Sequence, residues 1–197
     1  MSQEAAISVI HDTDKNVLDI ILSRRSQRAF ADTPVTSEQV ETLFEAAKWA
    51  PSSVNEQPWQ YIYANKGEEL WDVIFGTLHE GNQVWAKNAP VLVVSLARTT
   101  FSRNGRANAY AMYDLGGANV LLSLQATSMG LNVHQMGGYD HEGLRQALRV
   151  PSDLELGVIM AIGFPGDGEQ LPEQLRERDR APRVRRPLED FVMNKTY

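Results

Sequence analysis

The hydrophobic positions of the chain predict both helices and strands, and the clearest helix follows Pro34. Its apolar residues stand at the i, i+3, i+4 and i+7 spacing of a helix that packs one face on a core: Val40, Leu43, Phe44 and Ala47. Thr36 and Gln39 have the spacing of a capping box at its start. We expect it to stop at Pro51, because proline lacks the N–H that would continue the helical hydrogen bonds.

Three shorter helices are expected from the same spacing. One is capped by Asp12-Thr13-Asp14 and ends near Ser23, one lies around residues 68–79, and one follows Asp140 and is closed by Pro151. Each carries apolar residues on one side, so each is expected to pack against a core by that side.

The segment 109–129 differs from these helices because it is apolar nearly all round. Gly130 is well placed as its C-terminal stop. A helix with this composition is buried on every side. In so short a chain, we therefore expect a second subunit to cover one of its faces.

Strands are predicted at four places. Aromatic residues alternate along 59–64, as in a strand with two different faces, whereas 91–97 is continuously apolar, as in a strand buried on both. A short strand over 131–135 and a last core strand over 156–164 follow. Periodicity alone thus predicts a mixed fold with at least three buried strands.

Length and composition restrict the classes of protein. The chain has 197 residues, of which 43% are hydrophobic and 22% charged, as in an ordinary globular protein. We expect one domain over 1–197, with 1–13 as an N-terminal tail, 170–197 as an extended C-terminal arm and the polar stretch 99–108 as a mobile loop. The absence of cysteine excludes disulfides and thiolate nucleophiles.

The charge and the hydropathy of the chain restrict the binding partners and the cellular location that we expect. The formal net charge of −6 argues against a general nucleic-acid binder, which would carry a basic face. No apolar run is long enough to span a membrane, and residues 1–14 lack the pattern of a signal peptide, so the cytoplasm is expected. The four histidines have no metal-ligand spacing, and no metal is expected.

Two stretches are candidates for binding chemistry. Residues 51–59, Pro-Ser-Ser-Val-Asn-Glu-Gln-Pro-Trp, place two hydroxyls and two amides between prolines, which suits a planar, polar, mostly neutral ligand. Such clusters are also ordinary connectors between elements. Residues 24–30, Arg-Arg-Ser-Gln-Arg-Ala-Phe, and the six arginines of 176–186 offer guanidinium groups, which match phosphate oxygens in bidentate geometry. Each cluster taken alone also fits a solvated surface.

Together, 24–30 and 51–59 closely resemble the paired signatures of the FMN-dependent nitroreductase family. Gly130-Leu131, the segment 137–140 and the segment 162–165 extend the resemblance with the right order and spacing. It implies the α+β nitroreductase fold, a mainly antiparallel central sheet flanked by helices. It also implies an intertwined homodimer with two FMN molecules at the interface.

The resemblance implies specific flavin contacts. Arg24, Arg25 and Ser26 match residues that hold the phosphate and ribityl chain, Arg28 one that reaches the pyrimidine edge, and Arg183 and Arg185 the C-terminal phosphate clamp. Arg186 falls where the family often has an apolar residue. The remaining implied contacts come from the opposite subunit (Pro51, Ser52, Ser53 and Asn55) or from a strand and turn whose amides face the ring (Gln135, Gly137 and Gly138).

The implied function is reduction of an organic acceptor, such as a nitroaromatic or a quinone, by NADH or NADPH through bound FMN in ping-pong fashion. Because the cofactor carries the hydride, no side chain is named as catalytic. Two alternatives stay open: an FMN-dependent dehydrogenase or reductive dehalogenase, and a non-catalytic flavin-binding protein. The sequence has no recognisable set of residues for the 2′-phosphate of NADPH, so it does not distinguish NADPH from NADH as the electron donor.

Overall fold

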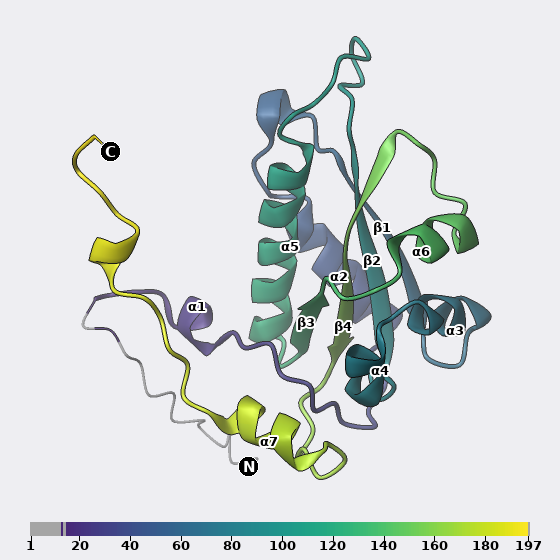
Figure 1. The fold of residues 1–197 in the computed structure, drawn as a ribbon, viewed down its shortest axis with the longest axis vertical. Coiled ribbons are helices and arrows are strands. Elements are labelled where there is room, and N and C mark those ends of the chain that lie inside the picture. The colour runs from purple at the N-terminus through teal and green to yellow at the C-terminus, as the bar shows by residue number, and fades with distance from the viewer. Residues whose placement is uncertain (1–12, 14, 197) are drawn as a thin grey trace.

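A four-stranded antiparallel sheet forms the centre of the molecule in a computed structural model that describes residues 13 and 15–196 (Figure 1). The strands are β1 (Trp59–Asn65), β2 (Val91–Arg98), β3 (Asn132–Met136) and β4 (Leu154–Gly163), in the spatial order β1-β2-β4-β3. All three pairings are antiparallel. The predicted strands are therefore confirmed.

Helices cover both faces of this sheet. On one face lie α2 (Ser37–Ala47) and α5 (Ala111–Ser128), and on the other α3 (Glu69–Gly76), α4 (Glu80–Ala86) and α6 (His141–Ala147). Two further helices are α1 (Asp19–Ser23), which contacts α5, and α7 (Glu173–Arg180), which precedes the last part of the chain; 3-10 turns occupy Ser53–Asn55 and Leu188–Asp190. This arrangement is the α+β fold that was expected.

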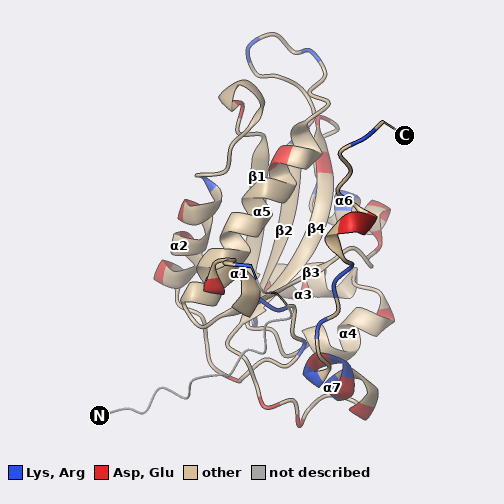
Figure 2. Ribbon diagram, turned by 90° about the vertical axis from the view of Figure 1, so that its left-hand side faces the viewer, with Lys and Arg blue, Asp and Glu red and all other residues tan. Residues whose placement is uncertain are grey.

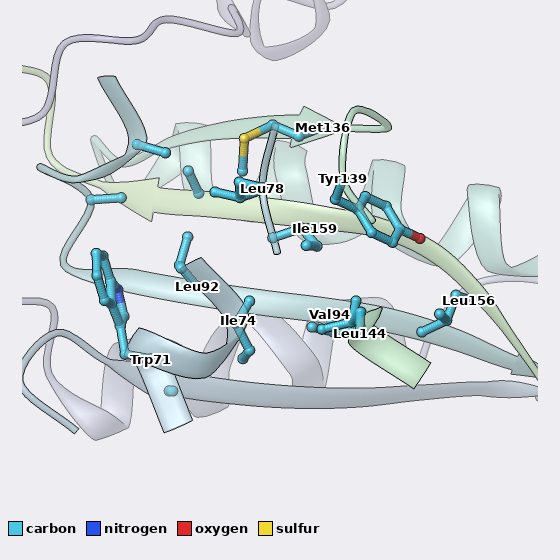
Figure 3. Close-up of a cluster of buried hydrophobic side chains, with 14 of the residues drawn as sticks. Trp71, Ile74, Leu78, Leu92, Val94, Met136, Tyr139, Leu144, Leu156 and Ile159 are labelled. Atoms are coloured by element: carbon cyan, nitrogen blue, oxygen red, sulfur yellow. The ribbon is translucent and has the colours of Figure 1, made fainter. Parts of the chain in front are cut away.

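The sheet separates two hydrophobic clusters, and β2 contributes to both. Leu92 and Val94 face the cluster under α3, α4 and α6, which Figure 3 shows, whereas Val91 and Val93 face the cluster under α2 and α5. Successive side chains of a strand point to opposite faces. The continuous apolar run therefore has a packing partner on each side, as predicted.

The local signals at two helix starts are also confirmed. Gln39 N–H donates to the Thr36 hydroxyl at 3.2 Å and the Gln39 amide accepts from Thr36 N–H at 2.9 Å, which completes the capping box of α2. The Asp140 carboxylate accepts from Gly143 N–H at 3.0 Å at the start of α6. Gly130 has φ +73°, the left-handed conformation that ends α5.

Two helix predictions need correction. The first helix begins at Asp19 rather than after Asp12-Thr13-Asp14, of which Asp12 and Asp14 lie outside the described residues. The helix expected over 68–79 ends at Gly76, and α4, a helix that was not predicted, starts at Glu80. The reason is a β-bridge between Leu78 and Tyr139, which takes the chain out of helical geometry.

The C-terminal segment contains one element that no sequence pattern predicted. Residues 173–180 form α7, and the arm from 181 onward runs away from the sheet with nearly every residue exposed (Figure 1). Apolar side chains are among them, with Val184 84% and Phe191 50% exposed. Within the described part of the chain, no helix is long and apolar enough to cross a membrane.

Candidate functional site

The early and late arginine clusters meet in one cavity of about 250 Å³. Segment 24–28, which follows α1, forms one wall, and the end of α7 with the start of the arm forms the other. In Figure 2, Lys and Arg positions (blue) occur along both segments. The lining residues are Arg24, Arg25, Ser26, Gln27, Arg28, Arg178, Asp179, Ala181, Pro182, Arg183 and Arg185.

Two of these arginines hold the walls together. Arg25 Nη2 donates to the backbone carbonyls of Asp179 at 3.1 Å and Ala181 at 2.9 Å, at the C-terminal end of α7. In the reverse direction, Arg183 donates to the carbonyls of Arg24, at 2.8 Å, and Leu22, at the end of α1. Carbonyls at a helix end lack intrahelical partners and are well matched to a cation.

Arg24 and Arg185 keep donors available to a ligand. Arg24 Nη1 donates to the Ser26 hydroxyl at 3.2 Å, and within the described part of the chain Arg185 donates only to the carbonyl of its neighbour Val184, at 2.9 Å. Burial lowers the pKa of the Arg24 guanidinium, and the charge of Arg185 lowers it further. Like charges gathered in this way are stabilised by an anion, and a phosphate group has the matching charge and oxygens.

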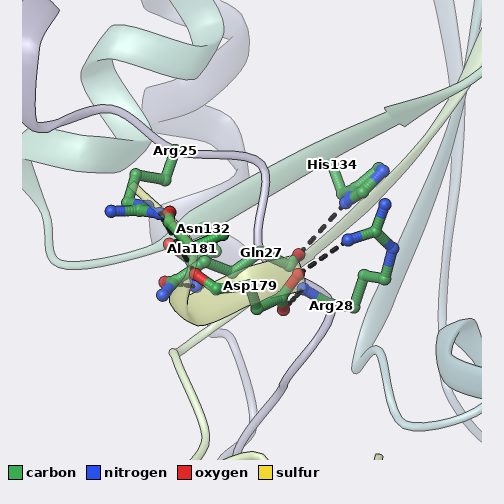
Figure 4. A network of polar contacts seen from close by, with 7 residues as sticks. All are labelled: Arg25, Gln27, Arg28, Asn132, His134, Asp179 and Ala181. Carbon is green, nitrogen blue, oxygen red and sulfur yellow. Dashed lines mark hydrogen bonds and ion pairs between the residues drawn. The ribbon is translucent and has the colours of Figure 1, made fainter. Parts of the chain in front are cut away.

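Arg28 lies in the same cavity but is already paired. Its Nη1 donates to Asp179 Oδ1 at 2.7 Å, and its backbone N–H donates to Asp179 Oδ2 at 2.6 Å (Figure 4). Sequence reasoning missed Asp179. Its only local signal was an acidic residue among arginines, which is common on exposed helices.

The edge strand β3 adjoins segment 24–28. Gln27 Oε1 accepts from Asn132 Nδ2 at 2.8 Å, and the Gln27 carbonyl lies 3.2 Å from His134 Nδ1. Gln135, one residue further, is exposed and donates to the Ser123 hydroxyl at 3.2 Å. The structure thus places β3 beside segment 24–28 through Asn132 and His134, while the Gln135 side chain contacts α5.

Gly137 and Gly138 follow β3, and neither has positive φ, so backbone conformation does not require glycine here. A Cβ at Gly138 would come within 3.0 Å of Asn82 Nδ2, whereas one at Gly137 would meet nothing within 4 Å. Gly137 therefore leaves an open approach to its backbone from solvent.

The other expected motif, residues 51–58, lies at the far end of α5. Ser53 N–H donates to Asp114 Oδ2 at 3.0 Å, in the first turn of that helix, whereas Gln27 contacts Asn132 beyond its last turn. The 18 residues of α5 span about 27 Å. Pro51, Ser52, Ser53 and Asn55 therefore do not reach the arginine cavity of their own chain (Figure 1).

The 51–58 loop has an unusual backbone. Val54, Asn55 and Gln57 have φ of 49°, 59° and 52°. A left-handed conformation is unfavourable for a β-branched residue such as Val54, and strain of this kind gathers at functional sites. The loop is fixed by Gln57 N–H, which donates to the Ser52 hydroxyl at 3.0 Å.

The 51–58 loop is also joined to the polar stretch 99–108, which folds as a hairpin through the bridge Thr100–Ala107. Ser102 N–H donates to Glu56 Oε1 at 2.6 Å. This bond lowers the pKa of the Glu56 carboxyl, and Arg103 and Arg98 lower it further. The hairpin and the loop are thus connected at the same end of α5.

One face of α5 is not covered by the described residues of its own chain. Tyr113 is 82% and Val120 51% exposed, and Met112 and Gly116 are exposed on the same side. The opposite face, with Leu115, Ala118 and Leu122, is buried. The prediction that every face of this helix is buried is therefore not met within one chain.

Comparisons with known proteins identify the family. The nitroreductase family model matches residues 21–80 and 75–164, and the chain belongs to the nitroreductase family. A protein of Archaeoglobus fulgidus named "Putative NADH dehydrogenase/NAD(P)H nitroreductase" is 28% identical in an alignment 166 residues long, which covers 79% of this chain and 89% of the relative.

Solved structures show the same fold. An oxidoreductase containing FMN is 36% identical, with a TM-score of 0.91 over 100% of this chain and 98% of its own. A protein of Desulfovibrio desulfuricans described as a "putative nitroreductase in complex with fmn" is 23% identical, with a TM-score of 0.73 over 94% of this chain and 99% of its own. The expected family and nitroreductase fold are confirmed.

Proposed function

We propose that the protein is an FMN-dependent oxidoreductase that takes electrons from NADH or NADPH and reduces an organic acceptor such as a nitroaromatic or a quinone. The observation that carries this proposal is the convergence of two arginine clusters, far apart in sequence, on one cavity beside β3. The relatives named for FMN and for NAD(P)H support the choice of cofactor and donor.

The residues of the cavity fit an FMN phosphate. Arg24, Ser26 and Arg185 have donors that can face its oxygens, while Arg25 and Arg183 hold the walls at the right separation. From Arg24 the extended segment runs toward β3, so the ring would lie near Arg28, Gln135 and the amides of Gly137 and Gly138. When bound there, FMN supplies the group that accepts a hydride from the nicotinamide and passes it to the acceptor.

The chain's own contribution is to bind and orient. Guanidinium groups anchor the charged end, and backbone N–H groups after β3 offer donors to the polar edge of a ring. Nicotinamide and acceptor would use the same ring face in turn, which would give ping-pong kinetics. No titratable side chain is assigned to proton transfer.

We propose a homodimer in which each site uses both chains. If the uncovered faces of two α5 helices pack antiparallel, the 51–58 loop at one end of α5 comes near the partner's arginine cavity at the other. The length of α5, about 27 Å, keeps these sites apart in one chain and supports this arrangement. So do the exposed apolar residues of the C-terminal arm, which would cover the partner's surface. We propose that the chain is a single domain. Its last segment, 170–197, contains α7 and the arm from 181 onward.

The test is a visible spectrum of the purified protein, with FMN added if none co-purifies, followed by anaerobic NADH and then NADPH. We expect flavin absorbance that bleaches with at least one nicotinamide and returns when a quinone is added. Flavin that stays oxidised with both would favour a non-catalytic flavin-binding protein. No flavin binding at all would overturn the proposal.

A further inference from the structure

Among the described residues that line the arginine cavity, Asp179 is the only acidic one. Its side chain is 9% exposed, against 23% for that of Arg28. Its carboxylate accepts from Arg28 Nη1 and from the Arg28 backbone N–H, and its carbonyl accepts from Arg25. One residue thus connects the last turn of α7 to two positions of segment 24–28 (Figure 4).

The ion pair between Asp179 and Arg28 lies at the end of the cavity that faces β3. Residues 24–28 have no helical or strand structure, and a stretch of this length spans up to about 13 Å. Arg24 lies at one end, near Arg185, and Arg28 at the other, next to His134 on β3. A ligand that places its phosphate against Arg24 and extends along this segment would therefore bring its opposite part to Arg28.

We propose that Asp179 is a positioning residue that holds the Arg28 guanidinium in place, reduces its effective positive charge, and thereby sets the reduction potential of the bound flavin. This inference rests on the proposed FMN site. Reduction of the ring by two electrons with uptake of one proton leaves one negative charge on it. A cation nearby stabilises that charge, and a carboxylate on the same cation opposes it.

The contacts favour this role over one confined to holding α7. A carboxylate that only fixed the helix could bond to backbone N–H groups alone, whereas Asp179 also binds the guanidinium at 2.7 Å. Arg25 already joins the end of α7 to segment 24–28 through two carbonyl bonds. The bonds of Arg25 would therefore connect the two segments without Asp179. What the Asp179–Arg28 ion pair adds is a negative charge beside the Arg28 guanidinium.

The experiment is to measure the reduction potential of bound FMN in the Asp179→Asn variant by anaerobic equilibration with a reference dye. Asn keeps an oxygen that can accept from Arg28 N–H but loses the negative charge. We expect a more positive potential, because the unpaired guanidinium stabilises the reduced ring more strongly. In binding terms, the ratio of the dissociation constants of oxidised and reduced FMN should rise.

Two controls make the result specific. Glu177→Gln removes the same charge from an exposed position of α7 and should leave the potential unchanged. In an Arg28→Gln background, Asp179→Asn should have little further effect, because the cation that it modulates is gone. Asp179→Ser serves as a second neutral variant if Asn disturbs folding, which the melting temperature reports.

The outcomes separate this inference from the function on which it rests. A wild-type protein that binds no FMN would overturn both. Normal FMN binding with an unchanged or more negative potential in Asp179→Asn would overturn the role of Asp179 alone. An equal shift in the Arg28→Gln background would also overturn it, because the effect would then be independent of Arg28.

Discussion

The guanidinium groups of the cavity divide into two kinds by what they contact. Arg25 and Arg183 each donate to two backbone carbonyls at the end of a neighbouring element, so their positions are fixed by the fold. Arg24 and Arg185 bond within their own segments and retain free donors. In the proposed site, one cluster would therefore serve as a structural clamp and as an anion site, with different residues in each role.

Replacing Arg24 or Arg185 by Ala should weaken FMN binding by about 1.5–3 kcal/mol, the range for a hydrogen bond to a charged group. Arg186→Ala is the matched control, because Arg186 lies over the Phe191 ring at 5.7 Å and does not line the cavity. Fluorescence titration of the apoprotein with FMN measures all three. Wild-type affinity in both Arg24→Ala and Arg185→Ala would contradict the phosphate assignment.

At the residue scale, His134 also predicts how the folding stability depends on pH. Its burial lowers the pKa of the imidazole, and Arg28 lowers it further. Below an unfolded pKa of about 6.5 the unfolded chain binds a proton that the folded chain does not. The stability that neutral His134 contributes is therefore present above that pH and lost as the pH falls toward the lower folded pKa.

Urea unfolding at several pH values between about 5 and 7 tests this. His134→Gln should reduce the loss of unfolding free energy on acidification, because Gln has no proton to gain. If the imidazole played no part, the free energy of unfolding would change with pH by the same slope in the wild type and the variant.

At the scale of elements, the junction between the 51–58 loop and α5 depends on one carboxylate. Asp114 is 4% exposed, lies in the first turn of α5 and accepts from Ser53 N–H. A negative charge at this end of a helix is also favoured by the helix dipole. The strained backbone of the loop is thus held by a contact that the helix start supports.

Asp114→Ala should lower the free energy of unfolding by about 1–3 kcal/mol, because it leaves the Ser53 N–H without its acceptor. Asp114→Asn should cost less, since an amide oxygen can still accept the bond. Denaturant unfolding gives both values, and FMN titration should follow the same order. Equal effects of the two substitutions would show that the bond is not what holds the loop.

Local patterns were sufficient to predict the sheet and the helices with strong signals. The β2 run, the Thr36–Gln39 capping box and the Asp140 cap all depend on neighbours a few residues apart, which the sequence displays directly. Convergence of the two arginine clusters on one phosphate was a hypothesis from their chemistry, which the family resemblance strengthened. Periodicity carries no information on which distant segments meet.

The elements that were missed depend on distant contacts. Residues 173–180 have almost no apolar periodicity, and their helix is connected to segment 24–28 through Arg25 and Arg28. The predicted start of α1 failed although its apolar positions were read correctly, because Leu18 is 69% and Ile21 47% exposed. A helix of five residues that buries none of them is marginal. The contact between Asp179 and Arg28 is visible only in the structure, because α7 brings the two residues together.

At the scale of the whole molecule, the uncovered face of α5 predicts self-association. Val120→Glu places a charge in the middle of that face and should yield a monomer by sedimentation analysis. Val84→Glu, which charges an exposed apolar position on α4, should leave the dimer intact. A monomeric wild-type protein, or a dimer in Val120→Glu, would contradict the proposed interface.

Complementation between two defective chains tests most directly the claim that one flavin site is built from two chains. One chain carries Arg24→Ala with Arg185→Ala, and the other carries Ser53→Ala with Asn55→Gly, since Gly accepts the φ of 59° at that position. The two chains bear different affinity tags, so that the mixed dimer can be isolated after co-expression. FMN content is then compared with that of each parent.

We predict that each parent binds FMN poorly and that the mixed dimer recovers about half of the wild-type FMN content. The reason is that one of its two sites combines an intact arginine cavity with an intact loop, whereas the other combines both defects. A mixed dimer that binds no more FMN than its parents would contradict a site shared between subunits.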